Sequence, residues 1–121
     1  MTQAHFFFNI DDPAGGVPRE LAPGITARVF PGDHAMISIV TIAPHAAGVL
    51  HSHPEEQWGV LLEGEAVRVQ DGQEIPVRAR DFWRTPGGVP HTIRGGPQGA
   101  VVLDIFSPPR EGYQKPGKGC R

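Results

Sequence analysis

Short hydrophobic runs rich in valine, isoleucine and phenylalanine alternate along this chain with clusters of glycine, proline and polar residues. Runs of roughly four to eight residues bounded by turn-forming residues are typical of β-strands. No window keeps apolar residues at the helical period for the length of an ordinary helix. The pattern predicts an all-β, mainly antiparallel fold with about nine strands, at residues 5–10, 25–30, 35–42, 57–62, 66–70, 74–78, 82–85, 91–94 and 100–106.

Turn residues between these runs indicate how the strands connect. Asp71-Gly72 is the strongest hairpin signal, and Glu63-Gly64 and Pro31-Gly32-Asp33 are further turn candidates. Many short strands at this spacing favour a sandwich or a closed barrel, because closure removes the exposed sheet edges that promote aggregation.

Length and charge narrow the class of protein. A chain of 121 residues with 39% apolar content can build one hydrophobic core, so we expect a single domain. The 11 basic and 13 acidic residues form no basic stripe, which argues against a nucleic-acid partner. The longest apolar runs are too short to span a bilayer, so no membrane association is expected. The single cysteine, Cys120, fits a reducing compartment, and we expect a cytoplasmic protein.

The chain divides into three parts by composition. Residues 25–110 carry the predicted barrel. Residues 1–24 form an N-terminal strand and loop in which three consecutive phenylalanines, residues 6–8, favour contact with a second subunit, although the strand could equally cap its own barrel. Residues 111–121 contain one large apolar side chain, Tyr113, and are expected to form a mobile tail.

Three histidines and an amide carry the densest chemical signal. His51 and His53 lie two residues apart, so in a strand both imidazoles point to the same face, and Gln57 follows after a bend at Pro54. His91 lies after a second glycine- and proline-rich turn. These donors suit one divalent ion: zinc, nickel, iron, manganese or copper. Because ligand histidines must be neutral, acidification below ~6.5 should release the ion. His45 is expected to be exposed or to lie behind the ligands.

These residues match two motifs of a known superfamily. His51, His53, Gln57 and Gly64 have the spacing of the first cupin motif, and Pro86, Gly88 and His91 that of the second, so residues 25–110 resemble a single-domain cupin. The resemblance implies a jelly-roll barrel, also called a double-stranded β-helix. The chain departs from the pattern at Gln57, where glutamate is commoner, and at Arg80 and Gly95, which are not ligand positions. A neutral ligand set leaves the ion its full charge and should hold it less tightly.

Asp104 lies within an unusually apolar strand. Burying an ionised carboxylate without a partner is costly, so a solvent-facing Asp104 is the simple alternative. Val102 and Phe106, however, share its face, which favours a cavity with one polar group. The spacing of Asp104, Phe106 and Arg110 resembles small cupins of the KdgF type, which linearise 4,5-unsaturated uronates. That resemblance implies an acid/base role for Asp104, a sugar pocket shaped by Phe106 and a substrate carboxylate bound by Arg110.

Other side chains have weaker assignments. Trp58 and Trp83 flank the two motifs and are candidates for substrate stacking, with a place in the core as the alternative. Glu55 and Glu56 are expected to be solvated turn residues. The four arginines of the middle segment are expected on the barrel exterior, although one of them could provide a second anion contact: Arg68, Arg78, Arg80 and Arg84.

The sequence thus predicts a metal-dependent cupin enzyme acting on a small carboxylated, sugar-like metabolite, with ring opening of an unsaturated uronate as the leading reaction. Small cupins commonly pair, so we expect a homodimer. Two alternatives remain: another cupin enzyme, such as a dioxygenase, isomerase or lyase, and a non-catalytic sugar or metal sensor. Neither a dinucleotide-binding glycine motif nor a phosphate-binding loop occurs in the sequence.

Overall fold

Strands make up most of the chain in the computed structural model, which describes residues 6–119. One eight-stranded sheet and a short 3-10 helix are formed by the following elements, given in chain order: β1 (Val17–Ala22), β2 (Ile25–Pro31), β3 (Met36–Ile42), β4 (Glu56–Gln70), β5 (Gln73–Arg78), β6 (Phe82–Thr85), β7 (His91–Ser107), η2 (Glu111–Gln114) and β8 (Gly117–Lys118). The all-β prediction is confirmed. No helix among these residues is long and apolar enough to cross a membrane.

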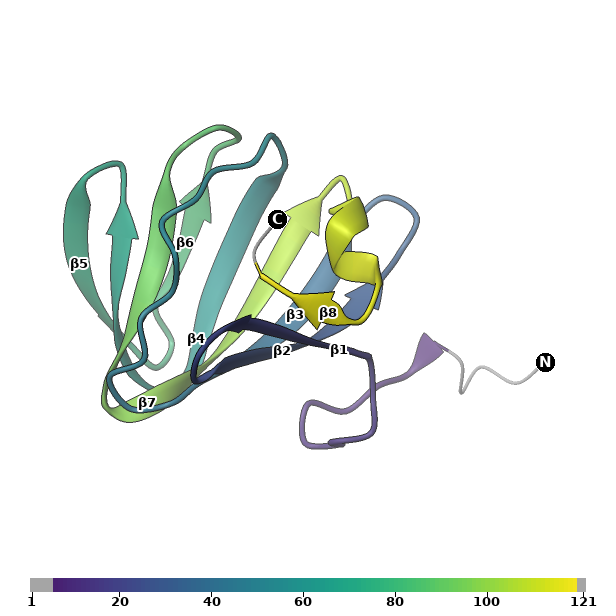
Figure 1. Cartoon of the computed structure of the whole chain (residues 1–121), viewed down its shortest axis with the longest axis horizontal. Helices are drawn as coiled ribbons and strands as arrows, with labels where there is room; N and C mark the ends of the chain where they lie inside the picture. Colours follow the sequence, from purple (N-terminus) through teal and green to yellow (C-terminus); the bar gives the residue numbers. More distant parts are fainter. Residues whose placement is uncertain (1–5, 120–121) are drawn as a thin grey trace.

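The two longest strands join the halves of the barrel. The sheet runs in the order β5-β4-β7-β3-β2-β1-β8, and β6 pairs with β4. Figure 1 shows β5 and β6 on one side of the molecule and β1, β2 and β3 on the other, with β4 and β7 reaching both. All neighbouring pairs are antiparallel except β1 with β8.

β4 replaces two predicted strands, because Glu63-Gly64 forms an irregularity inside one strand and not a hairpin turn. The register between β4 and β7 shifts between Leu61 and Glu63 and again between Gly64 and Ala66. Gly64 has φ +82°, and a Cβ there would lie 2.0 Å from the carbonyl oxygen of Gly99. β-Bulges of this kind bend a strand and change which residues face inward. Residues 91–94 and 100–106 likewise belong to the single strand β7.

The Asp71-Gly72 prediction is confirmed. Asp71 and Gly72 have φ values of 51° and 78°, the pair of positive values that a type I′ turn requires, and they join β4 to β5.

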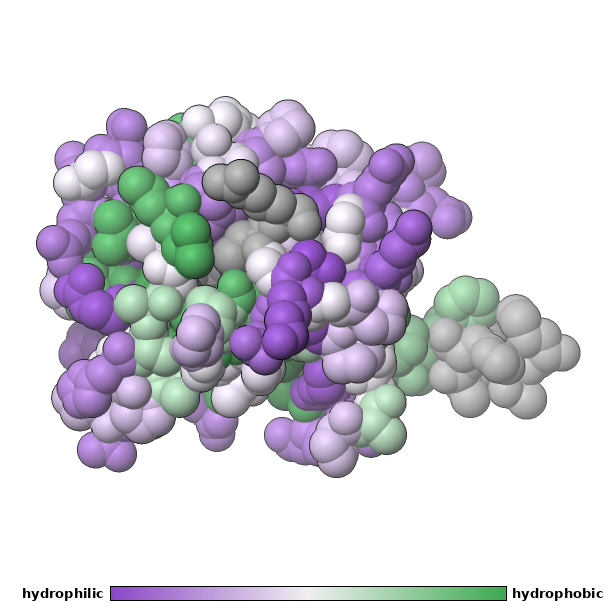
Figure 2. Space-filling view, viewed as in Figure 1, coloured by the Kyte–Doolittle hydropathy of each residue, from purple (hydrophilic) through white to green (hydrophobic). Residues whose placement is uncertain are grey.

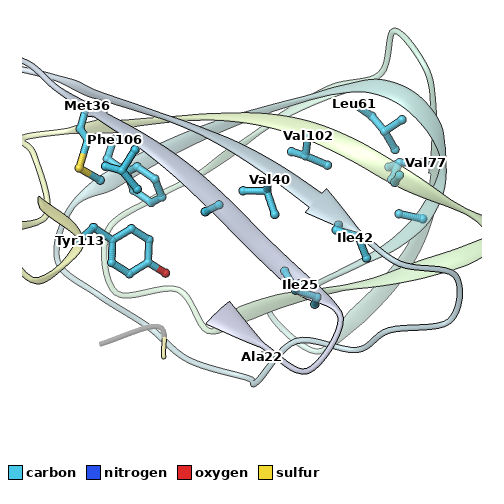
Figure 3. Close-up of a cluster of buried hydrophobic side chains, with 14 residues drawn as sticks. Ala22, Ile25, Met36, Val40, Ile42, Leu61, Val77, Val102, Phe106 and Tyr113 are labelled. Carbon is cyan, nitrogen blue, oxygen red and sulfur yellow. The ribbon is translucent and has the colours of Figure 1, made fainter. Parts of the chain in front are cut away.

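The barrel interior is filled with aliphatic side chains at one end and with aromatic and polar ones at the other. Figure 3 shows Leu61, Val77 and Ile42 far from the pair formed by Phe106 and Tyr113. The rings of Phe106 and Tyr113 have centroids 5.8 Å apart. The inward residues of β2 alternate with half-buried or exposed ones, and those of β3 do so except at Ile39, which is also buried.

Both ends of the chain differ from the sequence predictions. The expected strand at 5–10 begins outside the described residues, and residues 6–10 form turns and irregular structure with exposed phenylalanines. The strand at this end is instead β1, which the sequence analysis missed. The expected mobile tail comprises residues 111–121, of which residues 120–121 lie outside the described residues. The described part, residues 111–119, packs against β1: Tyr113 is buried and β8 pairs with β1.

Candidate metal centre and its cavity

Backbone pairing brings the three histidines together. His51 and His91 face one another in an isolated antiparallel bridge, with N···O distances of 3.1 and 2.8 Å. The turn before β7 is fixed to the same loop, since the Gly88 amide donates to the carbonyl of His53 at 2.8 Å. Candidate ligand atoms of His51, His53 and His91 all lie within 4.8 Å of one another. The predicted convergence of the imidazoles is therefore present in the structure.

Hydrogen bonds fix the orientation of each ring. Nδ1 of each histidine lies near a backbone carbonyl oxygen: His51 near Val49 at 2.8 Å, His53 near Glu55 at 3.0 Å and His91 near Val89 at 2.8 Å. A carbonyl can only accept, so Nδ1 carries the proton and Nε2 presents a lone pair. Such outer contacts are the usual way in which ligating imidazoles are oriented.

One contact and one buried nitrogen in the cluster are unfavourable unless a cation lies among these atoms. Nε2 of His53 lies 3.0 Å from Oε1 of Gln57, although both atoms are acceptors in this tautomer. Nε2 of His91 is buried without a hydrogen-bond partner among the described residues. Two ligands at a right angle, each about 2.1 Å from one ion, would lie about 3.0 Å apart. The residues present therefore fit a divalent metal ion.

Burial keeps the three imidazoles neutral. Desolvation lowers the pKa of His91 to about 3; the hydrogen bond that His91 donates to the carbonyl of Val89 acts against this shift, and nearby Arg68 adds to it. Desolvation also lowers the pKa of His51 and of His53, and Arg110 contributes in both cases. Neutral imidazoles are the form that binds metal, so the site is prepared for a cation at neutral pH.

Asp104 lies deep in the barrel beside this cluster. Its neighbours in register are Ser38 on β3 and Gly59 on β4, and its carboxylate lines a small inner cavity. Oδ1 is buried without a hydrogen-bond partner among the described residues. Burial raises the pKa of Asp104, whereas Arg68, a hydrogen bond from the Gln57 side chain and Arg110 lower it. Of the two alternatives left by the sequence, the cavity-facing one is the one observed.

Arg110 and Phe106 adjoin the same cluster. The ring of Phe106 lies between that of His53, at 5.6 Å between centroids, and that of Tyr113. The Arg110 guanidinium lies 4.1 Å from the centroid of Tyr113 and 5.6 Å from that of Phe106. A cation held over two aromatic faces keeps its plane fixed, which suits recognition of a flat carboxylate.

Glu55 and Tyr113 were not identified as site residues from the sequence. The Glu55 carboxylate lies 3.4 Å from Nδ1 of His53 and 3.9 Å from Nε of Arg110, so it links a candidate ligand to the candidate substrate cation. Its position between His53 and Gln57 was the only available signal. Tyr113 lies far along the chain in η2, and only the closed barrel brings it to the cavity.

Two hollows adjoin the cluster. The inner cavity has a volume of about 50 Å³ and is lined by apolar side chains and by a few polar groups, among them His51, His91 and Asp104. The outer pocket is open, has a volume of about 620 Å³ and is lined by His53, Glu55 and the residues around Arg110. Arg110 contributes to both hollows. The loop from residue 43 to 55 crosses this face of the molecule, where Figure 2 shows a hydrophobic patch and where Val49 and Leu50 are exposed.

The two tryptophans lie outside this cavity. Trp58 follows inward-facing Gln57 on β4 and therefore points to the outer surface, where it forms a row with Ile105 and Ile37 across three strands. Trp58 lines neither the inner cavity nor the outer pocket beside the cluster, and its suggested stacking role stays a prediction. Trp83 packs partly against the core and stacks on Arg68, at 5.5 Å from the guanidinium carbon to the ring centroid. His45 is exposed, with φ 61°.

Comparison with known proteins identifies the family. A model of the cupin domain matches residues 38–106, which include all four candidate ligands and Asp104. The chain belongs to the cupin family. Oxalate decarboxylase OxdC of Bacillus subtilis is 33% identical to this cupin over 98 residues, which cover 76% of this chain and 24% of that protein. The chain thus spans about a quarter of the length of this curated relative.

Solved cupin structures share the fold. An RmlC-like cupin from Shewanella frigidimarina has a TM-score of 0.77 at 25% identity, covering 90% of this chain and 95% of that one. KdgF from Halomonas sp. has a TM-score of 0.73 at 23% identity, with 78% and 88% covered. B. subtilis oxalate decarboxylase has a TM-score of 0.72 at 24% identity, with 88% and 30% covered. Another structure of that decarboxylase is described in terms of its Mn(II) centres.

Proposed function

We propose that this cupin is a metal-dependent enzyme that acts on a small carboxylated, sugar-like metabolite, and that its reaction is the ring opening of a 4,5-unsaturated uronate. The observation that carries the proposal is the position of Asp104, whose carboxylate lines the same inner cavity as His51 and His91, two of the three neutral imidazoles of the cluster. The likeness in fold to KdgF, which spans most of both chains, agrees with it.

Four side chains would hold the metal: His51, His53, Gln57 and His91. A divalent ion bound there polarises a substrate oxygen and so weakens its bond to hydrogen or carbon. The Gln57 amide has two roles, because its oxygen faces His53 while its side chain also hydrogen-bonds Asp104. A glutamate at this position would place a second negative charge beside Asp104 and could not donate to it.

Asp104 would move the proton. Ring opening converts the hemiacetal hydroxyl and ring oxygen of the uronate into an aldehyde and an enolate, and protonation of the enolate at carbon then gives a ketone. The carboxylate of Asp104 would accept the hydroxyl proton and return it to the enolate carbon, so atoms balance without a co-reactant. A carboxyl group whose pKa is raised by burial is a better proton donor and acceptor near neutral pH than an ordinary one.

Arg110 and Phe106 would orient the substrate. A sugar ring is too large for the inner cavity of about 50 Å³ and fits the outer pocket of about 620 Å³. Arg110 lies where the two meet and would bind the carboxylate, while the edge of Phe106 limits how the reacting end enters.

The decisive experiment combines metal analysis of the untreated protein with an absorbance assay on 4,5-unsaturated galacturonate. The conjugated double bond absorbs in the ultraviolet, and its loss reports linearisation. Consumption that requires the metal supports the proposal. Protein that binds the uronate without consuming it would instead be a sensor.

A second candidate is a metal-dependent decarboxylase or dioxygenase that acts on a small organic acid. The 33% identity to an oxalate decarboxylase and the small inner cavity favour it. Release of carbon dioxide or uptake of oxygen with a small dicarboxylate, without uronate turnover, would identify this activity.

We also propose that two copies pair through the N-terminal segment. Phe6, Phe7 and Phe8 are each more than 60% exposed, and Phe8 packs on Phe30 at 5.0 Å between centroids. Light scattering coupled to size-exclusion chromatography should give a dimer, and Phe7→Ser should weaken it. A monomer at all concentrations contradicts the pairing. The cytoplasmic location expected from the single cysteine stays a prediction.

A further inference from the structure

Arg68 is a buried cation that has no role in the ring opening proposed above. It projects from β4 into the barrel, is 4% exposed and lines the inner cavity with His91 and Asp104. The sequence predicts it on the exterior, because strand alternation alone does not include the bulges in β4 that change which residues face inward. A buried guanidinium is costly to desolvate unless its hydrogen-bond donors find partners.

The partners of Arg68 hold it in place without neutralising it. Nη2 donates to Oγ1 of Thr85 at 2.9 Å, Nε donates to Oε1 of Gln70 at 3.3 Å, and the group stacks on Trp83. Thr85 is itself fully buried and bonded to Gln70 at 2.7 Å. No ion pair within residues 6–119 joins Arg68 to a carboxylate. Asp104 is near enough to raise the pKa of Arg68 against the lowering by burial.

The charges around the inner cavity favour a negatively charged ligand. Arg68 contributes a positive charge that no ion pair among the described residues offsets, and Asp104 contributes one negative charge when ionised. Arg110 adds a second positive charge, with the Glu55 carboxylate 3.9 Å away, and the histidines are neutral. At about 50 Å³ the cavity has room for roughly two water molecules, the size of a carboxylate group.

We propose that Arg68 is a second anion-binding residue of this site, which receives the acidic end of the substrate inside the barrel while Arg110 contacts it from the mouth. The ligand class is an organic acid with a carboxylate next to a second oxygen that can become negatively charged, such as an enol acid or a 2-oxo acid. The ring-opened uronate has this arrangement. The identity of the substrate in this inference therefore rests on the proposed function, whereas the anion-binding role of Arg68 does not.

Binding of [13C]formate, followed by NMR, tests the site without turnover. Formate is small enough for the inner cavity, and neutral formamide is its matched control. We expect formate to bind to both metal-free and zinc-loaded protein, and formamide not to compete with it. Arg68→Met should weaken formate binding at least about tenfold, and Arg68→Lys should weaken it less. Arg84→Met, which removes an exposed arginine paired with Glu56, should change nothing.

Formate affinity that is unchanged in Arg68→Met would overturn the inference, and a lowered melting temperature in the same variant would show that Arg68 is only structural. If Arg68→Met fails to fold, Thr85→Val removes the hydroxyl that holds Nη2 and should weaken formate binding; an unchanged affinity in that variant also overturns the inference. Uronate assays separate the two proposals. If formate binding needs Arg68 but the protein does not turn over the uronate, only the proposed reaction is refuted. If Arg68→Met turns over the uronate with unchanged KM and kcat, only the role of Arg68 is refuted.

Discussion

Arg19 and Tyr113 lie near opposite ends of the chain, yet the Arg19 guanidinium carbon is 5.0 Å from the Tyr113 ring centroid. Arg19 also donates to carbonyl groups of the C-terminal segment, at 3.0 Å to Gly112, 2.9 Å to Lys118 and 2.8 Å to Gly119. One buried side chain on β1 therefore fixes the segment that carries Tyr113 to the cavity.

Replacing Arg19 should loosen this segment. We expect Arg19→Met to lower the free energy of unfolding by about 2–4 kcal/mol, because hydrogen bonds to a charged donor contribute more than neutral ones. Denaturation in urea measures the change. Arg94→Met is the control, because Arg94 pairs with Glu74 on the surface and its loss should cost below about 1 kcal/mol. Equal losses in both variants would show that Arg19 does not anchor the segment.

Removal of one imidazole should empty the metal site. We expect His91→Ala and His53→Ala to contain less than about a tenth of the wild-type metal, since losing a ligand costs at least as much affinity as losing its outer partner. His45→Asn should retain the metal, because His45 is exposed and asparagine tolerates its positive φ. Elemental analysis after purification gives the result, and full metal content in both alanine variants would contradict the three-histidine site.

Gln57→Glu should bind the metal more tightly and catalyse less well. The added carboxylate attracts the ion, but it replaces a hydrogen-bond donor to Asp104 by a negative charge. We expect uronate turnover to fall by at least about tenfold, which corresponds to about 1.4 kcal/mol in the barrier. Chelator competition measures the first effect and the absorbance assay the second. Turnover equal to that of wild type would mean that the amide has no role beyond ligation.

Asp104→Asn separates proton transfer from metal binding. We expect kcat to fall by ~10²–10⁴-fold, the usual contribution of a general acid/base, while metal content stays at the wild-type level. Retained turnover would favour the second candidate activity, a metal-dependent decarboxylase or dioxygenase that needs no buried carboxylate. Loss of both metal and activity would place Asp104 in the support of the ligands.

Stability of the metal-free protein should fall with acidification. The pKa of His91 in the folded state is about 3, below the ordinary value of 6.5, so the unfolded chain takes up a proton first. The free energy of unfolding therefore decreases between pH 6.5 and about 3, by up to about 1.4 kcal/mol per pH unit for each such histidine. Asp104 has the opposite effect on the free energy of unfolding at pH values above 3.8, its ordinary pKa. Its pKa is raised in the folded state, so the folded protein takes up this proton first and gains stability on acidification. Urea unfolding at several pH values should show a smaller slope for His91→Gln.

Lowered histidine pKa values also change the acidity at which metal is lost. The sequence alone predicts release below ~6.5, the value of unperturbed histidines. In the folded site protons compete less well with the ion, so we expect the metal to remain bound at pH 6 and to leave at lower pH. Dialysis at pH 6 and at pH 4 followed by elemental analysis checks this order. Complete loss at pH 6 would contradict it.

Local signals predicted much of the barrel and the metal cluster. The Asp71-Gly72 turn needs only two adjacent residues, and the shared face of His51 and His53 follows from strand alternation. Predictions from local sequence fail where tertiary contacts decide the structure. Glu63-Gly64 resembles a hairpin turn, but the pairing of β4 with β7 continues past it and makes it a bulge. The phenylalanines at 6–8 have high strand propensity, yet residues 6–10 form no strand.

Residues whose role depends on distant parts of the chain could not be assigned from the sequence. Composition alone predicts Tyr113 in a mobile tail. Its contacts with Arg19 on β1 and Phe106 on β7 form only when the barrel closes, so the sequence could not reveal them. Arg68 is one of several arginines on consecutive strands, and alternation alone gives no reason to single it out. Its inward direction is set by the irregularities in β4, which only the paired structure reveals.

Those irregularities also constrain how the length of this chain can vary. Inward positions on β4 are odd-numbered up to Leu61 and even-numbered from Ala66 to Arg68, and on β7 they change from His91 and Gly95 to Ala100 and Val102. His91 and Asp104 therefore lie on opposite sides of the point in β7 where the inward-facing positions change from odd to even numbers. Deleting one residue between 96 and 99 would turn one of them away from the other, so insertions and deletions at this bend should be tolerated only in pairs.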